Sequence, residues 1–217
     1  MKKILIVEGN QDKGFIELLF KRRKIDAKVN YGDFEIKPVG GFDKMITRLP
    51  VRFQTDNYDI IGLVVDADTD LQDHWNKLKL TFQKLGYQNL PKKPEPKGTI
   101  VLQNSLPKLG VWIMPDNQVE GTLETFVKFL IPDFDKDELL KLAEKTVDEL
   151  IQKKLNLFSV SDRMKAIVHT WLAWQEEPGL SLGQAINFRF TQKEKGYLLD
   201  DRKASPFILW LQKLFKD

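Results

Sequence analysis

The sequence predicts an α/β fold with a central, mostly parallel sheet flanked by helices, followed by a helical C-terminal extension. Two short runs of aliphatic residues, Ile4–Val7 and Ile60–Val65, have the continuous hydrophobicity typical of strands that are covered on both faces. A segment with helical spacing follows each run, as in a βα unit. This alternation stops after Leu130. We therefore expect an α/β domain over residues 1–131 and a helical extension over residues 132–217 that packs on it.

The elements of the α/β domain follow from local patterns. The first strand ends at Glu8, and from Asp12 the apolar residues keep helical spacing until four cations at 21–24, which favour a helix C-terminus. In a later helix, a stripe that includes Trp75 continues until Gly86 stops it. Between the first helix and the helix with Trp75, which covers 71–85, we expect short strands near 28–31 and 34–39, a helix after Gly40-Gly41 and a strand over 60–65. After it we expect a stiff basic loop with three prolines over 87–98, strands over 99–102 and 109–114, and a helix over 120–130.

The last third of the chain has helical patterns only. Asp135 or Asp133 is placed to cap a helix whose apolar face continues to Ile151. A second apolar face lies between Met164 and Leu172. Ser205-Pro206 is a good N-cap followed by a first-turn proline, which predicts a terminal helix.

Composition excludes several classes of protein. The 217 residues are 42% hydrophobic and 30% charged, enough apolar material for a buried core. Lys and Arg total 34 against 31 Asp and Glu, and this net charge of +3 is too small for a polybasic protein that binds nucleic acid or membranes through charge alone. The absence of Cys excludes disulfide scaffolds, zinc–thiolate sites and Cys nucleophiles. Since no apolar run reaches about 18 residues, we expect a soluble cytoplasmic protein with no membrane partner.

Acidic residues follow both buried strands. Glu8 follows the first strand, and Asp66 and Asp68 follow the second. In a parallel sheet the carboxyl ends of neighbouring strands meet at one edge, where ligands bind. Clustered carboxylates repel one another, and a hard divalent cation relieves this repulsion. Because all the donors are oxygens, the predicted ion is Mg²⁺ or Mn²⁺.

The two acidic segments carry a family resemblance. Residues 6–12, IVEGNQD, resemble the VEG element of the Toprim domain of topoisomerases, bacterial primases and OLD nucleases, and residues 64–70, VVDADTD, resemble its DxD element. The resemblance covers about residues 1–130 and implies a Toprim-like, Rossmann-like core. It implies that Glu8 is a general acid, general base or metal ligand and that Asp66 and Asp68 hold Mg²⁺. Asp12 resembles the second acid of the ExxxD form in nuclease-like members.

The resemblance extends beyond these motifs but stops short of a complete known enzyme. The whole chain is similar to a small family of bacterial proteins of unknown function that is grouped with Toprim-like proteins, including the stretches at 115–117 and 170–175. The chain has no Cys and little room for the tyrosine-bearing domain of topoisomerases or the zinc ribbon of primases, which argues against those two activities. A GxxxxGKS/T loop is also absent, so the ATPase that accompanies Toprim in OLD nucleases would be either a separately encoded partner or missing.

Several acidic residues have two interpretations. Asp70 either joins the metal site or caps the helix that begins at Leu71. Glu120 and Glu124 either complete a second metal site or stabilise the start of their helix through its dipole. Asp116 and Asn117 fit turn positions.

The histidines and the basic loop also have less specific interpretations. His74 and His169 have no partner at metal-ligand spacing and are interpreted as structural. The lysines between Pro91 and Lys97 either contact a phosphate backbone or form an ordinary charged surface loop.

Two functions follow from these expectations. The first is Mg²⁺-dependent hydrolysis of nucleic acid, in which Glu8, Asp66 and Asp68 are the catalytic and metal-binding residues. Further ligands would come from Asp12, Asp70, Glu120 and Glu124. The alternative is a non-catalytic module that binds a metal or nucleotide inside a larger complex, with a separate ATPase or another protein. The carboxylates favour the enzyme, and the near-neutral charge favours the module.

Overall fold

The computed structural model describes residues 1–22, 33–178, 182 and 203–216. These residues belong to two compact units, each described by itself: Met1–Glu120 together with Ser205–Asp217, and Gly121–Ala204. The strand expected near 28–31 lies outside the described residues.

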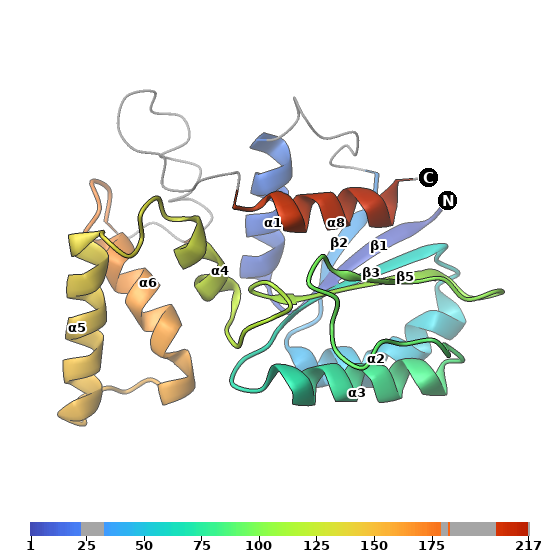
Figure 1. The fold of residues 1–217 in the computed structure, drawn as a ribbon, viewed down its shortest axis with the longest axis horizontal. Helices are drawn as coiled ribbons and strands as arrows, with labels where there is room; N and C mark the ends of the chain where they lie inside the picture. Colours follow the sequence, from blue (N-terminus) through green and yellow to red (C-terminus); the bar gives the residue numbers. More distant parts are fainter. Residues whose placement is uncertain (23–32, 179–181, 183–202, 217) are drawn as a thin grey trace. The chain divides into compact units, whose positions relative to one another are not determined.

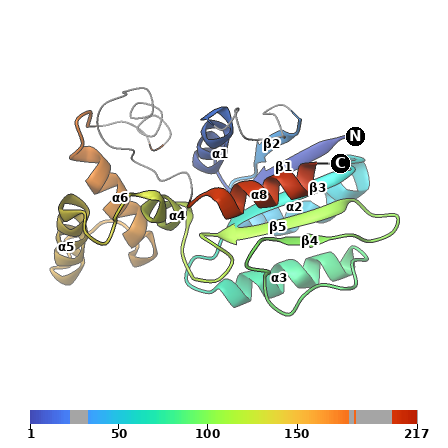
Figure 2. The ribbon, with the colours of Figure 1, turned by 45° about the horizontal axis from the view of Figure 1, so that its top comes forward.

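The first unit is built on a five-stranded sheet in the order β2-β1-β3-β5-β4 (Figures 1 and 2). All neighbours are parallel except β4, which pairs antiparallel with β5. The predicted α/β fold with a mostly parallel sheet is therefore confirmed. The strands are β1 (Lys3–Val7), β2 (Glu35–Pro38), β3 (Ile60–Asp66), β4 (Thr99–Val101) and β5 (Lys108–Met114).

Helices cover both faces of this sheet. In Figures 1 and 2, α2 and α3 lie on one face, and α1 and α8 lie on the other. Side chains alternate along a strand, so Ile61, Leu63 and Val65 of β3 all join the core beneath α2 and α3. The helices are α1 (Asn10–Arg22), α2 (Phe42–Thr55), α3 (Leu71–Lys84) and α8 (Ser205–Phe215).

Helix α8 belongs to the α/β unit, which differs from the boundary at 131/132 that the sequence predicts. Two paired glycines, Gly62 of β3 and Gly110 of β5, leave room for Leu214 of this helix. A Cβ at Gly110 would lie 2.4 Å from Leu214 Cδ2, so the helix approaches the sheet closely. The first unit therefore consists of two separate stretches of the chain, Met1–Glu120 and Ser205–Asp217, because the terminal helix packs on the sheet at these glycines.

Gly110→Ala is expected to destabilise the protein by about 1–3 kcal/mol, the usual cost of overpacking a core. The cause is the contact of the new methyl group with Leu214, which is fully buried. Urea denaturation measures the change. Gly14→Ala in α1 is the matched control: a Cβ there meets nothing within 4 Å, so alanine should be neutral or stabilising by up to about 1 kcal/mol. Equal stability of Gly110→Ala and the wild type would contradict this packing.

The second unit is helical in its described part. It contains α4 (Leu123–Leu130), α5 (Glu138–Gln152), a 3₁₀ turn (Val160–Asp162) and α6 (Arg163–Ala173). The N-cap of α5 is Asp137, whose Oδ1 accepts from the Leu140 N–H at 2.7 Å, rather than Asp135 or Asp133. A bidentate pair joins the two longer helices, since Arg163 Nε and Nη2 donate to the two carboxylate oxygens of Asp148 at 2.6 and 2.7 Å.

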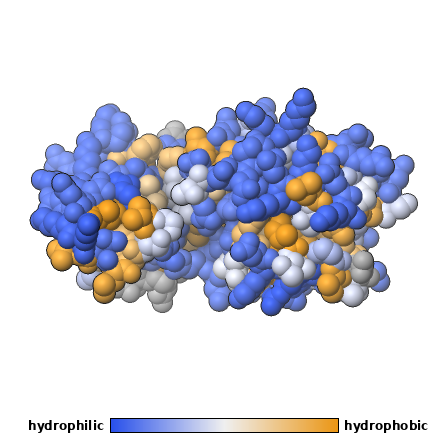
Figure 3. Space-filling model, turned by 90° about the horizontal axis from the view of Figure 1, so that it is seen from below, coloured by the Kyte–Doolittle hydropathy of each residue, from blue (hydrophilic) through white to orange (hydrophobic). Residues whose placement is uncertain are grey.

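The surface is largely hydrophilic on the face drawn in Figure 3, with small hydrophobic patches. Scattered apolar side chains of this kind are normal on a folded protein. None of the helices in the described part of the chain is long and apolar enough to cross a bilayer.

Candidate functional site

The acidic segments meet where the direction of the helical connections changes. Strands β1 and β3 are parallel neighbours, with Val7 opposite Val64. Helix α1, which follows β1, and helix α3, which follows β3, lie on opposite faces of the sheet (Figure 1). Open α/β sheets bind ligands in the crevice at such a switch point, beyond the carboxyl ends of the strands. Glu8 and Asp66 occupy these two strand ends.

A direct hydrogen bond joins the two strand ends. Glu8 Oε1 accepts from the backbone N–H of Asp66 at 2.8 Å. The structure therefore brings Glu8 and Asp66 together, as the pattern of acid-ended strands predicts. The Glu8 carbonyl oxygen also accepts from the N–H groups of Gly40 and Gly41, at 2.7 and 3.1 Å, which ties the end of β1 to the segment before α2.

The Glu8 carboxyl has an unusual affinity for a proton. Burial raises its pKa from 4.5 to about 7; the N–H of Asp66 opposes this shift, the negative charges of Asp12 and Asp68 add to it, and the N–H of Phe42 again opposes it. A carboxyl with a pKa near 7 exchanges protons readily at neutral pH, which is the property that a general acid or base requires.

The stability of the metal-free protein should therefore depend on Glu8 between pH 4.5 and pH 7. In this window the folded protein holds a proton that the unfolded chain has lost, so the contribution of Glu8 to the free energy of unfolding falls as the pH rises, by about 1–3 kcal/mol in total. Glu8→Gln removes this titration. In EDTA, we expect the variant to gain stability relative to the wild type between pH 5 and pH 8, as measured by thermal melts. A difference that is the same at both pH values would contradict the raised pKa.

Asp12 and Asp68 surround Glu8 from two elements. Asp12 lies in the first turn of α1, is only 7% exposed, and accepts from the Gly9 N–H through Oδ2 at 2.8 Å. Asp68 lies in the turn after β3 with φ of 49°, and 52% of its side chain is exposed. Both are close enough to raise the pKa of Glu8. Four of the predicted acids, Glu8, Asp12, Asp66 and Asp68, thus lie together where β1 and β3 end. We call this group the acidic junction.

His74 also belongs to this junction, although its sequence pattern predicts only a structural histidine. Its Nδ1 lies 2.9 Å from the Asp66 carbonyl oxygen, and its ring packs on Phe42 with centroids 4.2 Å apart. A carbonyl oxygen only accepts, so Nδ1 must carry the hydrogen. In the neutral ring, Nε2 is then an acceptor, and it lies 4.0 Å from Asp68 Oδ2. His74 therefore positions the segment that carries the aspartates. The one available signal was its spacing, four residues after Asp70 at the start of a helix.

Three of the remaining acids, Asp70, Glu124 and Asp116, make local hydrogen bonds. Asp70 caps α3, accepting from the Asp73 N–H through Oδ1 at 2.8 Å, as its alternative interpretation predicts. Glu120 lies in the loop after β5. Glu124 belongs to the second unit, where it is buried and Oε2 accepts from the Thr122 hydroxyl at 2.8 Å. Asp116 accepts from two backbone N–H groups as a turn residue. A metal-binding role for Asp70, Glu120 or Glu124 stays a prediction.

The carboxylate oxygens of these acids suit a hard cation, but the side chains are not yet arranged around one position. Within the described ranges, no group of three or more His, Asp or Glu side chains is arranged to hold a metal ion as it stands. Glu8 is turned to the Asp66 N–H, and like charges keep metal-free carboxylates apart. Binding a divalent cation at Glu8, Asp66 and Asp68 therefore requires side-chain rotation.

Comparison with known proteins shows the family of this chain. The model of a family described as "Protein of unknown function (DUF3226)" matches residues 2–216. The chain belongs to this family. No curated protein and no solved structure matches the chain. The DUF3226 match spans both units, so the α/β unit and the helical unit are parts of one family architecture.

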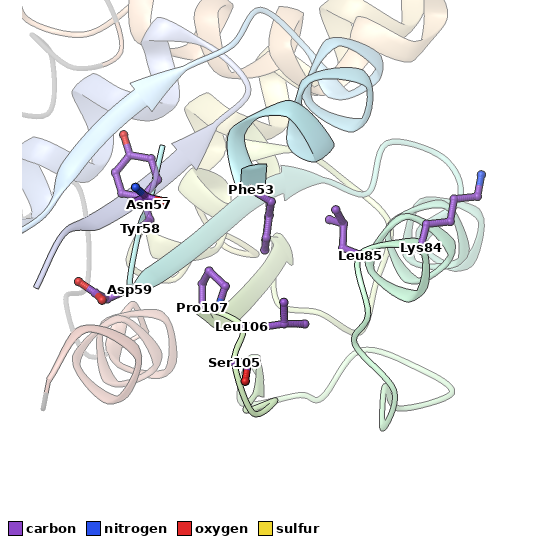
Figure 4. A pocket seen from close by; sticks show the side chains of 9 residues that line it. All are labelled: Phe53, Asn57, Tyr58, Asp59, Lys84, Leu85, Ser105, Leu106 and Pro107. Carbon is purple, nitrogen blue, oxygen red and sulfur yellow. The ribbon is translucent and has the colours of Figure 1, made fainter. Parts of the chain in front are cut away.

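This DUF3226 protein also has a cavity at the opposite end of the sheet. Its volume is about 540 Å³, and its lining comes from the ends of α2 and α3 and the loop before β5 (Figure 4). Asp59 lines it just before β3 begins, whereas Asp66 ends the same strand about 20 Å further along. None of the predicted site residues lines this cavity, so it is separate from the acidic junction.

Proposed function

We propose that the acidic junction is a Toprim-like site for Mg²⁺- or Mn²⁺-dependent hydrolysis of phosphodiester bonds in nucleic acid. The observation that carries this proposal is Glu8: a carboxyl with a pKa near 7, hydrogen-bonded to the end of the neighbouring strand at a switch point of the sheet. Perturbed carboxyls in such a crevice are typical of catalytic sites. The adjacent, acid-ended parallel strands support the likeness to Toprim.

Each residue of the junction has a distinct role in this proposal. Glu8 takes the proton from an attacking water or returns one to the leaving oxygen; in the metal-free protein its pKa near 7 makes both protonation states accessible at neutral pH. Asp66 and Asp68 are the metal ligands, with Asp12 beside them. A bound divalent ion would supply positive charge to the reacting oxygens. His74 holds the β3–α3 turn through the Asp66 carbonyl oxygen, and so orients both aspartates.

A non-catalytic metal- or nucleotide-binding module is the second candidate. Two observations favour it: the net charge is only +3, and the described carboxylates are not grouped for an ion without rotation. In such a module, metal or nucleotide binding would order the junction and stabilise a surface for another protein.

Cleavage assays separate the two candidates. Purified protein is incubated with single- and double-stranded DNA and RNA in Mg²⁺, in Mn²⁺ and in EDTA. The enzyme hypothesis predicts products in the presence of the metals and none in EDTA. A protein that binds the metal and leaves every substrate uncut would favour the module.

A further inference from the structure

A second pocket, of about 430 Å³, adjoins the acidic junction within the first unit. Three segments form it: the start of α3, the lysine-bearing loop before β4, and the loop after β5. Asp70, which begins α3, comes two residues after Asp68, so their Cα atoms are at most about 7–8 Å apart. The volume suits a small ligand such as one nucleobase. The lining residues are Asp70, Leu71, Gln72, Lys93, Pro94, Pro96, Asn117, Gln118 and Glu120.

The lining combines hydrogen-bond acceptors and donors with apolar contacts. Asp70 and Glu120 offer carboxylate oxygens, while Gln118 and Lys93 offer N–H donors. The prolines and Leu71 supply apolar surface. A flat heterocycle with amino and carbonyl groups on its edge matches this mixture, and carboxylates accept from an exocyclic amino group such as N4 of cytosine.

One donor atom of the pocket, the amide nitrogen of Asn117, lacks a partner among the described residues. Asn117 is 2% exposed, and its Oδ1 accepts from the Ile113 N–H at 2.7 Å. Its Nδ2 is buried and has no hydrogen-bond partner among the described residues. An unpaired buried donor is costly. An acceptor on a bound molecule, such as a base carbonyl, would remove this cost after a small shift of the loop.

The loop beside the pocket also suits the rest of a nucleotide. Lys92 and Lys97, which do not line the pocket, are exposed and form no ion pair with any other described residue. The loop itself is held in place, because Trp75 Nε1 donates to the Pro91 carbonyl oxygen at 3.2 Å and the Glu95 N–H donates to Thr99 Oγ1 at 3.0 Å. Cations on a fixed loop favour phosphate contacts outside the pocket.

We propose that this pocket binds an unpaired nucleobase with an exocyclic amino group, from the nucleotide at or beside the phosphodiester held by the acidic junction. This inference rests on the proposed function and names its substrate class: single-stranded nucleic acid with a base turned into the protein. Glu120 accepts a hydrogen bond from the amino group of the base.

The test compares two oligonucleotides that differ at the base edge. Fluorescein-labelled oligo(dC) and oligo(dU) ten-mers are titrated with the full chain in Ca²⁺, and binding is measured by anisotropy while gels confirm that the oligonucleotides stay intact. The wild type should bind oligo(dC) at least about fivefold more tightly, the lower end of what one specific base contact gives. Glu120→Gln should reduce the preference to less than about twofold. Glu95→Gln, the same change at an exposed carboxylate of the basic loop outside the pocket, should retain it.

The outcomes separate the pocket from the catalytic proposal. Three results would overturn the proposal that the pocket binds a base: equal binding of the two oligonucleotides by the wild type, a preference that persists in Glu120→Gln, or no binding of either oligonucleotide. Cleavage in Mg²⁺ without a base preference would support the enzyme hypothesis and contradict base binding in the pocket. A base preference without cleavage would support the pocket and shift the function to the non-catalytic module.

Discussion

Glu8→Gln is expected to lower the rate of metal-dependent cleavage by a factor of about 10²–10⁴, the usual contribution of a general acid or base. Gln keeps the size of the side chain, and its carbonyl oxygen can still accept from the Asp66 N–H. It cannot carry the negative charge or exchange the proton. The rate of cleavage of a labelled substrate in Mn²⁺ at pH 7.5 measures the effect.

Two comparisons make this result specific. Circular dichroism and thermal melts should show a folded Glu8→Gln protein. Glu149→Gln, which changes an exposed carboxylate on α5, should cleave at the wild-type rate. Cleavage at the same rate by Glu8→Gln would indicate a contaminating nuclease or a site elsewhere in the chain.

Trp210→Ala should cause the largest loss of stability, about 3–5 kcal/mol, as for other buried aromatic residues. Trp210 of α8 is 1% exposed and packs against Trp112 and Phe207, with ring centroids 5.7 and 5.8 Å away. Its Nε1 donates to the Thr99 carbonyl oxygen at 3.3 Å. The ring also lies against Gly98, where a Cβ would be only 2.2 Å from Trp210 Cδ1. Urea denaturation measures the loss.

Leu209→Ala is the matched control on the same helix. Leu209 is 62% exposed, so its truncation should change the free energy of unfolding by less than about 1 kcal/mol. If Trp210→Ala cost no more than Leu209→Ala, α8 would not be packed on the sheet, and the assignment of residues 205–217 to the α/β unit would be wrong.

The sheet could be predicted from the sequence, but the packing of the last helix, α8, on that sheet could not. β1 and β3 were predictable because continuous aliphatic runs of this length are typical of strands buried on both faces. The place of α8 depends on Gly62 and Gly110, which make a groove only when the two strands pair in register. That pairing is a long-range property, whereas the local pattern of the chain predicts the terminal helix as part of the C-terminal extension.

The site shows the same distinction between local and long-range information. Glu8 and Asp66 were predictable neighbours because acids that end adjacent parallel strands must meet. The contact of His74 with the Asp66 carbonyl oxygen was not predictable, because it depends on how α3 begins relative to β3. Asp70 followed its local capping pattern. The buried Nδ2 of Asn117, which has no partner among the described residues, had no signal in the sequence beyond that of a turn residue.

Divalent-ion titration is the most direct test that Asp66 and Asp68 hold a metal ion beside Glu8. EDTA-treated wild-type protein is melted in increasing Mg²⁺ or Mn²⁺, beside Asp66→Asn and the control Asp73→Asn, which changes an exposed aspartate of α3. We expect stabilisation of the wild type and the control, of about 2.7 kcal/mol at 100 times the dissociation constant, and none in Asp66→Asn. A wild-type melting temperature that stays constant through millimolar Mg²⁺ and Mn²⁺ would contradict the metal site.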